Sequence, residues 1–522
     1  MSPMKRRTFL EVTGKTAFAM LYGSSLVGGE RAKFNIRDFG AKGDKVANDQ
    51  AAIQAAIDAC ANSGGGIVYF PHGDYLTGTL QLRSGVTLLL DAKATIWVSR
   101  SPKHFENEHY GHLILAKGAR DVAVIGSGKI QGYADQPLQK RQHGEFRYGI
   151  MLFEDCHNVI IRGITIYYSD SWTIHLKRCE GVLVEGVTIR NNYDRINSDG
   201  INPNCCRNVR IVKCDIVAGD DCIAVKTTEP HPCEDVEVRD CVLETRATAL
   251  KLGTESRGLF RNIRFSRCTI RNSTVGIGLY MKDGGTMENV SFSEISIETR
   301  PTPDARSFPI FMDIERRHKD SDLGFIRNVT LERISIRTGS GILIQGMPER
   351  PIEGLIMQGI SLHVTRFEDY SQRRKHIGGS RTTSDERDVI YARQPSYATI
   401  AHVKGLKVRD FTADISGEVH NKCERSAIWL HEVEGGTLAN ILRTPPSGEK
   451  LPIIMLHNCR FISVMECKAP LGTKVFLAVS GKHTEGIVLE GNRLEMAEQP
   501  IGASSEVREG AIKVVKEKNG GS

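Results

Sequence analysis

The stretch Gly181-Val-Leu-Val-Glu-Gly-Val-Thr-Ile189 sets the pattern for the middle of this chain of 522 residues. The same arrangement of apolar and polar residues returns at Asn208-Val-Arg-Ile-Val-Lys-Cys-Asp-Ile216, Asp235-Val-Glu-Val-Arg-Asp-Cys-Val-Leu243, Asn262-Ile-Arg-Phe-Ser-Arg-Cys-Thr-Ile270 and Asn289-Val-Ser-Phe-Ser-Glu-Ile-Ser-Ile297. Each copy begins 27 residues after the one before it. Such a fixed internal period is typical of a repeat protein in which each copy forms one structural unit.

Within each copy, apolar residues occupy the second, fourth, seventh and ninth positions. This alternation predicts two short strands joined by a turn. One unit cannot bury its own apolar side, so successive units are expected to stack in parallel at the strand spacing of ~4.8 Å. A leucine-rich repeat needs a ladder of Leu and Asn, and a propeller needs about 40 residues per blade, so neither fits. The predicted fold is all-β, a single-stranded right-handed parallel β-helix.

A helical cap is predicted upstream of the repeats. Asn48-Asp49 can cap a helix whose apolar stripe is Ile53, Ala56, Ile57 and Cys60, and Gly64-Gly65-Gly66 ends it. The open end of a solenoid needs such a cover. We therefore expect an export signal over residues 1–33, a β-helix domain over 34–500 and a polar tail over 501–522.

Charge and composition narrow the function classes. The net charge is +7, but residues 1–33 supply +4 of it, which leaves a nearly balanced surface rather than the basic face that nucleic acid requires. Lys5-Arg6-Arg7-Thr8-Phe9-Leu10, followed by a short apolar run, resembles a twin-arginine signal. We expect export to the periplasm or outside the cell, no insertion into a membrane, and a monomer.

The cysteines indicate a buried ladder rather than a metal site. Cys156, Cys179, Cys206 and Cys233 each lie two residues before a repeat begins, so equal repeats stack them. No C-x-x-C pair occurs, which argues against a zinc site. Free buried thiols are the favoured state, and disulfides between stacked neighbours stay open as an alternative.

Two acidic turn motifs lie in consecutive repeats. Asn197-Ser198-Asp199-Gly200 ends one turn, and Gly219-Asp220-Asp221 lies in the next. Stacking would bring Asp199, Asp220 and Asp221 within one or two strand spacings. Hydrolysis of a polysaccharide needs a protonated carboxyl group and an ionised one, and crowded carboxylates raise one pKa. The same motifs are also ordinary turn chemistry, so spacing alone does not decide between the two readings.

A family resemblance adds to this pattern. The start Phe34-Asn-Ile-Arg-Asp-Phe-Gly-Ala-Lys-Gly-Asp44, the pair Phe70-Pro71 and the two acidic motifs resemble glycoside hydrolase family 28, the polygalacturonase family. Ser171-Trp172-Thr173-Ile174-His175 resembles a segment of its exo-acting members. The motifs extend to about Ile297, and the repeats to about Leu494.

The resemblance implies roles for named residues. It implies an inverting hydrolase without metal or cofactor, in which Asp220 is the general acid while Asp199 and Asp221 hold and activate water. Asn197 and Lys282 would contact the substrate, the lysine through a uronate carboxylate.

Two positions depart from the family pattern. Thr248 replaces a histidine, and Tyr280 replaces an arginine. Both are still expected near the acids, as contacts to an altered sugar.

Four functions compete at this point. We favour a hydrolase acting on a pectic polysaccharide other than plain galacturonan, such as a rhamnogalacturonan or a substituted galacturonan. A homogalacturonan exo-hydrolase comes second. The alternatives are a pectate-lyase-type eliminase, for which no cluster of calcium ligands stands out, and a non-catalytic carbohydrate-binding or adhesive β-helix. Trp172 fits either a sugar platform or the core, and the charged run Asp313-Ile-Glu-Arg-Arg317 reads as a solvated face.

Overall fold

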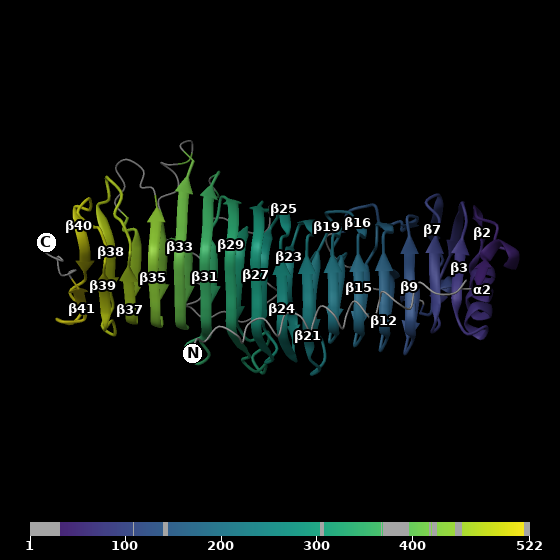
Figure 1. Ribbon diagram of the computed structural model, residues 1–522, viewed down its shortest axis with the longest axis horizontal. Helices are drawn as coiled ribbons and strands as arrows, with labels where there is room; N and C mark the ends of the chain where they lie inside the picture. Colours follow the sequence, from purple (N-terminus) through teal and green to yellow (C-terminus); the bar gives the residue numbers. More distant parts are fainter. Residues whose placement is uncertain are drawn as a thin grey trace, which may run out of the picture.

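The computed structural model describes residues 32–107, 109–138, 145–302, 307–366, 368, 396–416, 419, 425–443 and 451–515. Its strands stack side by side along one long axis, with α2 (Gln50–Asn62) at the end where the described chain begins (Figure 1). Every pairing between these strands is parallel. The predicted parallel β-helix is confirmed.

The strands form two large sheets. The first has 15 strands: β5 (Leu80–Gln81), β8 (Tyr110–Lys117), β11 (Arg147–Glu154), β14 (Ile174–Lys177), β17 (Ile201–Asn204), β20 (Ile223–Thr227), β23 (Thr248–Ser256), β26 (Val275–Met281), β28 (Phe308–Ile314), β30 (Ile342–Gln345), β32 (Ser396–Ala401), β34 (Ser426–His431), β36 (Ile454–His457), β38 (Val475–Ser480) and β40 (Gln499–Ala503).

The second sheet has 26 strands. Its first half comprises β1 (Lys33–Asn35), β2 (Asp44–Asn48), β3 (Gly66–Phe70), β4 (Gly73–Thr77), β6 (Val86–Leu90), β7 (Ala94–Val98), β9 (Arg120–Gly126), β10 (Lys129–Gln131), β12 (His157–Arg162), β13 (Thr165–Tyr167), β15 (Glu180–Glu185), β16 (Thr188–Arg190) and β18 (Arg207–Val212). The remainder comprises β19 (Asp215–Ala218), β21 (Cys233–Arg239), β22 (Val242–Thr245), β24 (Leu259–Ser266), β25 (Thr269–Ser273), β27 (Thr286–Thr299), β29 (Phe325–Thr338), β31 (Ile352–Val364), β33 (Val403–Ile415), β35 (Glu434–Arg443), β37 (Arg460–Met465), β39 (Ile487–Glu490) and β41 (Ile512–Val515). Two short 3-10 helices, Ile36–Phe39 and Pro102–His104, complete the elements.

The core follows the repeat register. Val182, Val209, Val236, Ile263 and Val290 are paired in successive strands, and all are at most 1% exposed. Full burial of one such aliphatic side chain contributes about 1.5–3 kcal/mol, so a continuous column of them holds the coils together. The second position of each sequence copy is thus a core position, as the alternation predicts.

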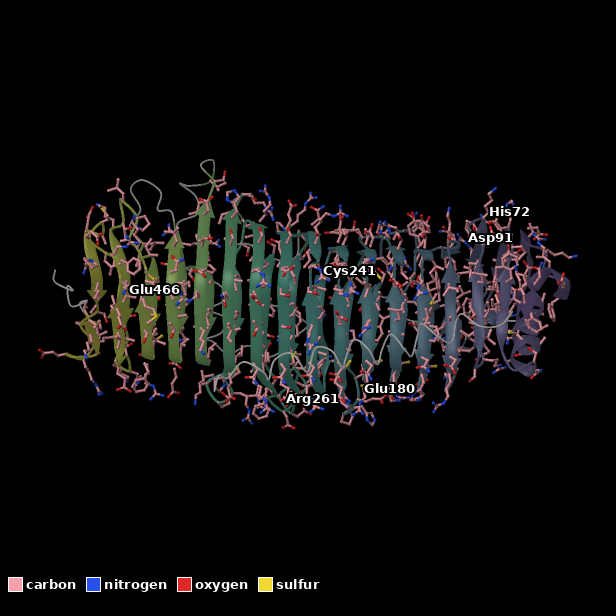
Figure 2. All side chains as sticks on the ribbon, viewed as in Figure 1. His72, Asp91, Glu180, Cys241, Arg261 and Glu466 are labelled. Carbon is pink, nitrogen blue, oxygen red and sulfur yellow. The ribbon has the colours of Figure 1, made fainter. Side chains whose placement is uncertain are left out.

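The cysteine ladder has the predicted form. Cys179 donates its backbone N–H to Cys206 Sγ, and Cys206 donates its own to Cys233 Sγ. All cysteines in the described ranges are buried free thiols. Figure 2 shows Cys241 within the stack, whereas Glu180 and Arg261 lie along its lower edge.

The helical cap has the predicted residues. Ile53, Ala56, Ile57 and Cys60 of α2 are fully buried. Asn48 Oδ1 accepts the first free N–H of the helix, from Gln50, at 3.0 Å. The capping side chain is therefore that of Asn48, and not that of Asp49, which immediately precedes the helix.

One predicted domain boundary differs from the structure. The polar tail was expected to begin at residue 501, but β40 pairs with β38, and β41 pairs with β39. These strands extend the stack to Val515 because Ile501 and Ile512 continue the register of the apolar columns. Residues 1–31 of the expected export signal lie outside the described ranges.

The turns between the sheets form two long edges. At one edge β7, β10, β13, β16, β19 and β22 end, and the chain enters the 15-stranded sheet. We call this edge, made of residues 99–107, 132–138, 145–146, 168–173, 191–200, 219–222 and 246–247, the acid edge.

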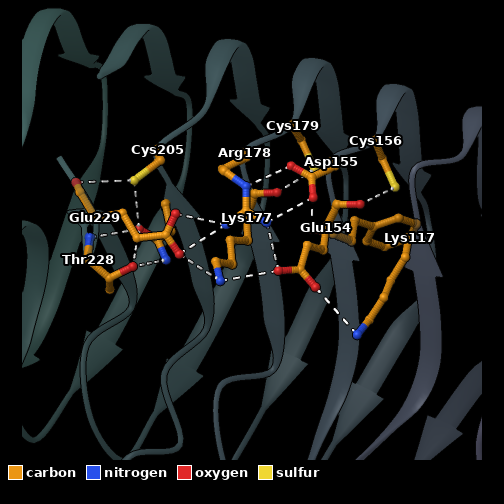
Figure 3. Close-up of polar contacts among 12 residues, drawn as sticks. Lys117, Glu154, Asp155, Cys156, Lys177, Arg178, Cys179, Cys205, Thr228 and Glu229 are labelled. Atoms are coloured by element: carbon orange, nitrogen blue, oxygen red, sulfur yellow. Dashed lines mark hydrogen bonds and ion pairs between the residues drawn. The ribbon is translucent and has the colours of Figure 1, made fainter. Parts of the chain in front are cut away.

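At the opposite edge the chain leaves the 15-stranded sheet through a network of ion pairs (Figure 3). Arg178 Nε lies 2.7 Å from Asp155 Oδ1, and Lys177 Nζ lies 2.8 Å from Glu229 Oε1. Glu154 contacts both cations. Because these cations are already paired with carboxylates, this edge offers little net attraction to an anionic ligand.

Candidate active site

The two acidic motifs lie in neighbouring turns of the acid edge. Asn197 and Asp199 lie between β16 and β17, and Asp220 and Asp221 lie between β19 and β20. β16 pairs with β19, and β17 pairs with β20, so the two turns are one strand spacing of ~4.8 Å apart. The structure therefore brings the three predicted carboxyl groups into one cluster.

Asp199 is the most enclosed member of this cluster. It is 2% exposed, and Asn202 Nδ2 donates to its Oδ2 at 2.8 Å. Burial and the charge of Asp220 raise the pKa of Asp199 well above its ordinary value, against the lowering effect of Lys226. A carboxyl group in this position retains its proton to higher pH than a solvated aspartate does.

Asp220 is partly exposed, whereas Asp199 and Asp221 are each 2% exposed. The backbone N–H of Asn197 donates to Asp220 Oδ2 at 3.0 Å. Burial and the charge of Asp221 raise the pKa of Asp220, while Lys251 and the Asn197 N–H lower it. The result is a carboxyl group with a raised pKa that is anchored through one oxygen, on a partly exposed residue.

Asp221 is 2% exposed, and both of its carboxylate oxygens accept hydrogen bonds. The Thr248 N–H donates to Oδ1 at 3.2 Å, and Lys251 Nζ donates to Oδ2 at 2.7 Å. Burial lowers the pKa of Lys251, but Asp221 and Asp220 together raise it above its ordinary value. A charge-assisted contact of this kind stabilises the negative charge of Asp221.

Asn197 joins the cluster to the upstream turns. Its backbone is left-handed, with φ of 57°, which asparagine tolerates better than most residues. This conformation aims its N–H at Asp220, while Arg147 Nη1 donates to its side-chain oxygen at 3.2 Å. Arg147 is 1% exposed and also holds the carbonyl of Ile196 at 2.9 Å. The exposed amide of Asn197 is therefore fixed in place beside Asp220.

An aromatic and charged group lies on the upstream side of the acids. Trp172 is partly exposed, and its ring meets the ring of His175 edge to face with centroids 4.7 Å apart. Lys226 Nζ lies 4.9 Å from the Trp172 ring centroid and 2.9 Å from Glu255 Oε2. Burial, with the charges of His112 and Lys177, lowers the pKa of His175 to about 3, so its imidazole is neutral near pH 7.

Comparison with known proteins identifies the family. The model of the family described as glycosyl hydrolases family 28 matches residues 60–375, more than half of the chain. The chain belongs to glycosyl hydrolase family 28. This confirms the resemblance that the acidic motifs carried.

Individual relatives match a smaller part of this family 28 chain. A probable polygalacturonase of Vitis vinifera is 31% identical over 212 residues, which cover 36% of this chain and 43% of that protein. An exopolygalacturonase of Platanus acerifolia is 27% identical over 202 residues, which cover 37% of this chain and 52% of that protein. The chain thus spans about half the length of the curated relatives it matches.

Two solved structures share the fold. A hyperthermoactive exopolygalacturonase from Thermotoga maritima aligns with a TM-score of 0.56 at 22% identity, over 64% of this chain and 87% of that one. A family 28 exopolygalacturonase from Yersinia enterocolitica aligns with a TM-score of 0.51 at 15% identity, over 92% of this chain and 80% of that one. At these identities the likeness shows the fold alone.

The two residues that depart from the family 28 pattern contact each other. Thr248 Oγ1 and Tyr280 Oη lie 3.2 Å apart, and both residues are nearly fully buried. Lys251 Nζ lies 5.0 Å from the Tyr280 ring centroid, while the Thr248 N–H binds Asp221. Thr248 and Tyr280 therefore lie at the cluster as predicted, but as buried residues beside Asp221 and Lys251.

The structure contradicts the predicted role of Lys282. Its side chain is fully buried, and its Nζ lies 2.5 Å from Asp313 Oδ2 and 2.7 Å from Glu315 Oε2. An ammonium enclosed by two carboxylates has no free surface for a uronate group. Asp313 and Glu315 are correspondingly 0% and 4% exposed, so the run 313–317 is not the solvated face that its charge suggested. We assign Lys282 a structural role.

Sequence reasoning missed Lys226, Lys251 and Glu255. Each lies in β20 or β23, where alternate side chains of a strand point outward, and alternation alone does not reveal which outward residue meets an acid. Lys251 is paired in register with Ala224, so its place near the acids could be predicted only if the offset between β20 and β23 were known. Among the described residues, no group of three or more His, Cys, Asp or Glu side chains is arranged to hold a metal ion.

Proposed function

We propose that this family 28 protein hydrolyses glycosidic bonds of a pectic polysaccharide, with Asp199, Asp220 and Asp221 as its catalytic carboxyl groups. The observation that carries the proposal is the environment of neighbouring Asp220 and Asp221. Asp220 is accessible and has a raised pKa, whereas Asp221 is buried against Lys251. A carboxyl group with a raised pKa beside a carboxylate that is ion-paired with a lysine can supply the acid and the base that hydrolysis requires.

Asp220 is the general acid in this proposal. Its Oδ2 is anchored by the Asn197 N–H, which leaves the other oxygen to donate a proton to the glycosidic oxygen of the leaving sugar. A pKa raised toward the working pH makes this donation efficient, because the protonated form is populated and still acidic.

Asp221 and Asp199 hold and activate the attacking water. Lys251 stabilises the negative charge of Asp221, which suits it to accept a proton from water. Asp199, bound to Asn202 and close to both other acids, completes the polar pocket around that water. Attack from the face opposite the leaving group inverts the anomeric carbon.

The walls of the site favour a pectic substrate other than plain galacturonan. The resemblance places a histidine and an arginine where this chain has Thr248 and Tyr280, which bind each other instead. Lys226 and Lys251 lie beside the acids, but each is paired with a carboxylate of this chain, Glu255 or Asp221. A rhamnogalacturonan or a substituted galacturonan, in which fewer plain uronate groups meet the walls of the site, is in keeping with this arrangement. Action on homogalacturonan from a chain end is the second candidate, since several relatives are named exopolygalacturonases.

A panel of defined pectic fragments tests this proposal. The protein is incubated with galacturonan, rhamnogalacturonan and substituted galacturonan oligosaccharides, and products are identified by chromatography and mass spectrometry. We expect saturated products with new reducing ends from at least one rhamnogalacturonan or substituted fragment. Products that absorb in the ultraviolet would indicate a lyase, and intact fragments throughout would indicate a non-catalytic binding protein.

We also propose that the protein is exported through its N-terminal segment. The support is the sequence Lys5-Arg6-Arg7-Thr8-Phe9-Leu10 with its apolar continuation. No helix in the described ranges has the length and apolar character needed to cross a membrane. Export should fail when Arg6 and Arg7 are both replaced by lysine, as measured by fractionation of expressing cells. Unchanged export of that variant would contradict a twin-arginine route.

A further inference from the structure

A hollow lies on the acid edge, upstream of the acids. It has a volume of about 520 Å³ and is formed where β4, β7, β10 and β13 end. Its lining includes Lys45, Trp97, Arg100, Tyr133 and Tyr168. Trp97, Tyr133 and Tyr168 are each partly exposed, so their rings line the hollow without being part of the core.

The two cations of this hollow, Lys45 and Arg100, contact aromatic rings rather than carboxylates. Lys45 Nζ lies 3.4 Å from the Trp97 ring centroid, and Arg100 Cζ lies 4.9 Å from the Tyr133 ring centroid. Neither cation has a carboxylate at ion-pair distance within the part of the chain that the structure describes. This differs from the opposite edge, where Lys177 and Arg178 are paired with carboxylates. Asp135 also lines the hollow, but the two cations outnumber this carboxylate, so positive charge remains available to an anionic ligand.

The ring positions are fixed by contacts outside the hollow. Trp97 Nε1 donates to Asp74 Oδ1 at 2.9 Å. The Tyr133 ring packs on Tyr148, with centroids 4.7 Å apart, and the Tyr133 N–H donates to Tyr148 Oη at 2.7 Å. Fixed aromatic rings beside cations suit a carboxylated sugar, whose apolar C–H face packs on a ring while its carboxylate binds the guanidinium.

The hollow is aligned with the acids along the stack. Trp97 pairs with Gln131, Gln131 with Tyr167, and Tyr167 with Arg190, which precedes the turn of Asp199. Three strand steps separate Trp97 from that turn, a distance of ~14 Å along the axis. An extended polysaccharide that lies along the acid edge can therefore reach both places at once.

We propose that this hollow is a remote binding site for a uronate-containing stretch of the same polysaccharide chain that is cleaved at the acids. The inference rests on the proposed function. Its ligand is an anionic oligosaccharide, bound through the carboxylate by Arg100 and Lys45 and through its apolar face by the partly exposed rings. The site adds affinity for long chains because it makes contacts that a short oligosaccharide cannot reach.

The experiment compares chain lengths in the double variant Lys45→Gln, Arg100→Gln. Both cations are exposed and make no ion pair among the described residues, so their loss leaves the core packing intact. We expect KM for an oligosaccharide of about eight units, long enough to cover the ~14 Å between hollow and acids, to rise about tenfold. KM for a short oligosaccharide, and kcat for both, should match the wild type. The control is Arg264→Gln, Lys407→Gln, which removes two exposed cations from the 26-stranded sheet.

The outcomes separate the two proposals. Equal KM values of variant and wild type on the long oligosaccharide would overturn the remote site and leave the proposed function standing. If the wild type cleaves neither oligosaccharide, the proposed function fails. Calorimetric binding of the long uronate oligosaccharide to Asp220→Asn, with and without the double substitution, then decides the remote site alone. Equal affinities in that pair would overturn it.

Discussion

The outer face of the 15-stranded sheet differs on the two sides of the acids. Upstream, on β11 and β14, the outward residues Leu152, Glu154, His175 and Lys177 are all partly exposed. Downstream, on β28, β30 and β32, the outward residues are at most 2% exposed: Phe311, Asp313, Leu343, Gln345, Thr399 and Ala401. Both faces come from the same parallel stack, so the difference lies in side chains and not in backbone.

The downstream face is closed by its own chemistry. Phe311, Leu343 and Ala401 form a second apolar cluster with Tyr280 outside the main core. Lys282, Asp313 and Glu315 pair beside it, out of contact with solvent. The surface beside the acids that stays open to the proposed polysaccharide therefore lies upstream, toward Trp172 and the hollow that contains Trp97. Outward side chains that are already paired or packed leave no such surface on β28, β30 and β32.

The largest effect is expected downstream, from Lys282→Met. Removal of the ammonium leaves Asp313 and Glu315 buried without their cation, and breaking a buried ion pair in this way costs about 3–5 kcal/mol. Urea unfolding measures the loss. Lys177→Met, whose ion pair with Glu229 is partly exposed, should cost about 1 kcal/mol or less. Equal losses of stability in the two variants would contradict a downstream face closed by buried ion pairs.

The next effect is at the boundary between the two faces, from Asp220→Asn. The amide cannot donate the proton that the leaving sugar needs, so kcat should fall about 100-fold or more. Reducing-sugar release measures it. Asp194→Asn, an exposed acid on the same edge, serves as control and should keep wild-type kcat. A near-normal rate for Asp220→Asn would remove Asp220 from its role.

A smaller effect is expected upstream, from Trp172→Ala. Loss of a partly exposed ring beside the acids should raise KM about tenfold, equivalent to ~1.4 kcal/mol of binding. Trp429 on β34 is a matched ring that packs against the downstream cluster. Trp429→Ala should leave KM unchanged. A KM effect at Trp429 rather than Trp172 would reverse the proposed direction of binding.

The repeat explains why so much of the fold could be predicted. Val182 and its partners recur at a constant spacing. Repeats of equal length place these apolar residues directly above one another when they stack. The proximity of Asp199 and Asp220 could be predicted from the same regularity, since the turns of equal repeats stack on one another. The predicted contact of Lys282 with substrate was wrong because the regular spacing ends nearby. After Asn289 the pattern next begins at Asn328, 39 residues later. The partners Asp313 and Glu315 come from that longer coil.

Lys251 and the C-terminal strands illustrate a different difficulty. Lys251 is one of several outward residues on its strand, and its contact with Asp221 depends on a register that the sequence does not contain. The expected polar tail over 501–522 misses β41, whose Ile512, Val514 and Val515 stand among charged residues and whose pairing with β39 alone reveals a strand. The extent of the stack is thus a tertiary property.

The smallest effect concerns pH and Asp199. Its folded pKa lies above its ordinary value, so the folded protein binds the proton more tightly and loses stability as pH rises from about 4 through the folded pKa. Asp199→Asn removes this loss. The variant should be more stable than the wild type by about 1 kcal/mol at pH 7 and equal to it near pH 3. Urea unfolding at both pH values measures it, and a pH-independent difference would contradict the cause.

Proton NMR of the first product tests the central account most directly. A defined oligosaccharide that the protein cleaves is followed from the first minutes, before mutarotation, and the anomeric signal of the new reducing end is assigned. If Asp220 protonates the leaving oxygen while Asp221 and Asp199 direct water to the opposite face, the first product has the inverted configuration. A first product with the retained configuration would show that one of these carboxylates attacks the sugar itself, and would contradict the account.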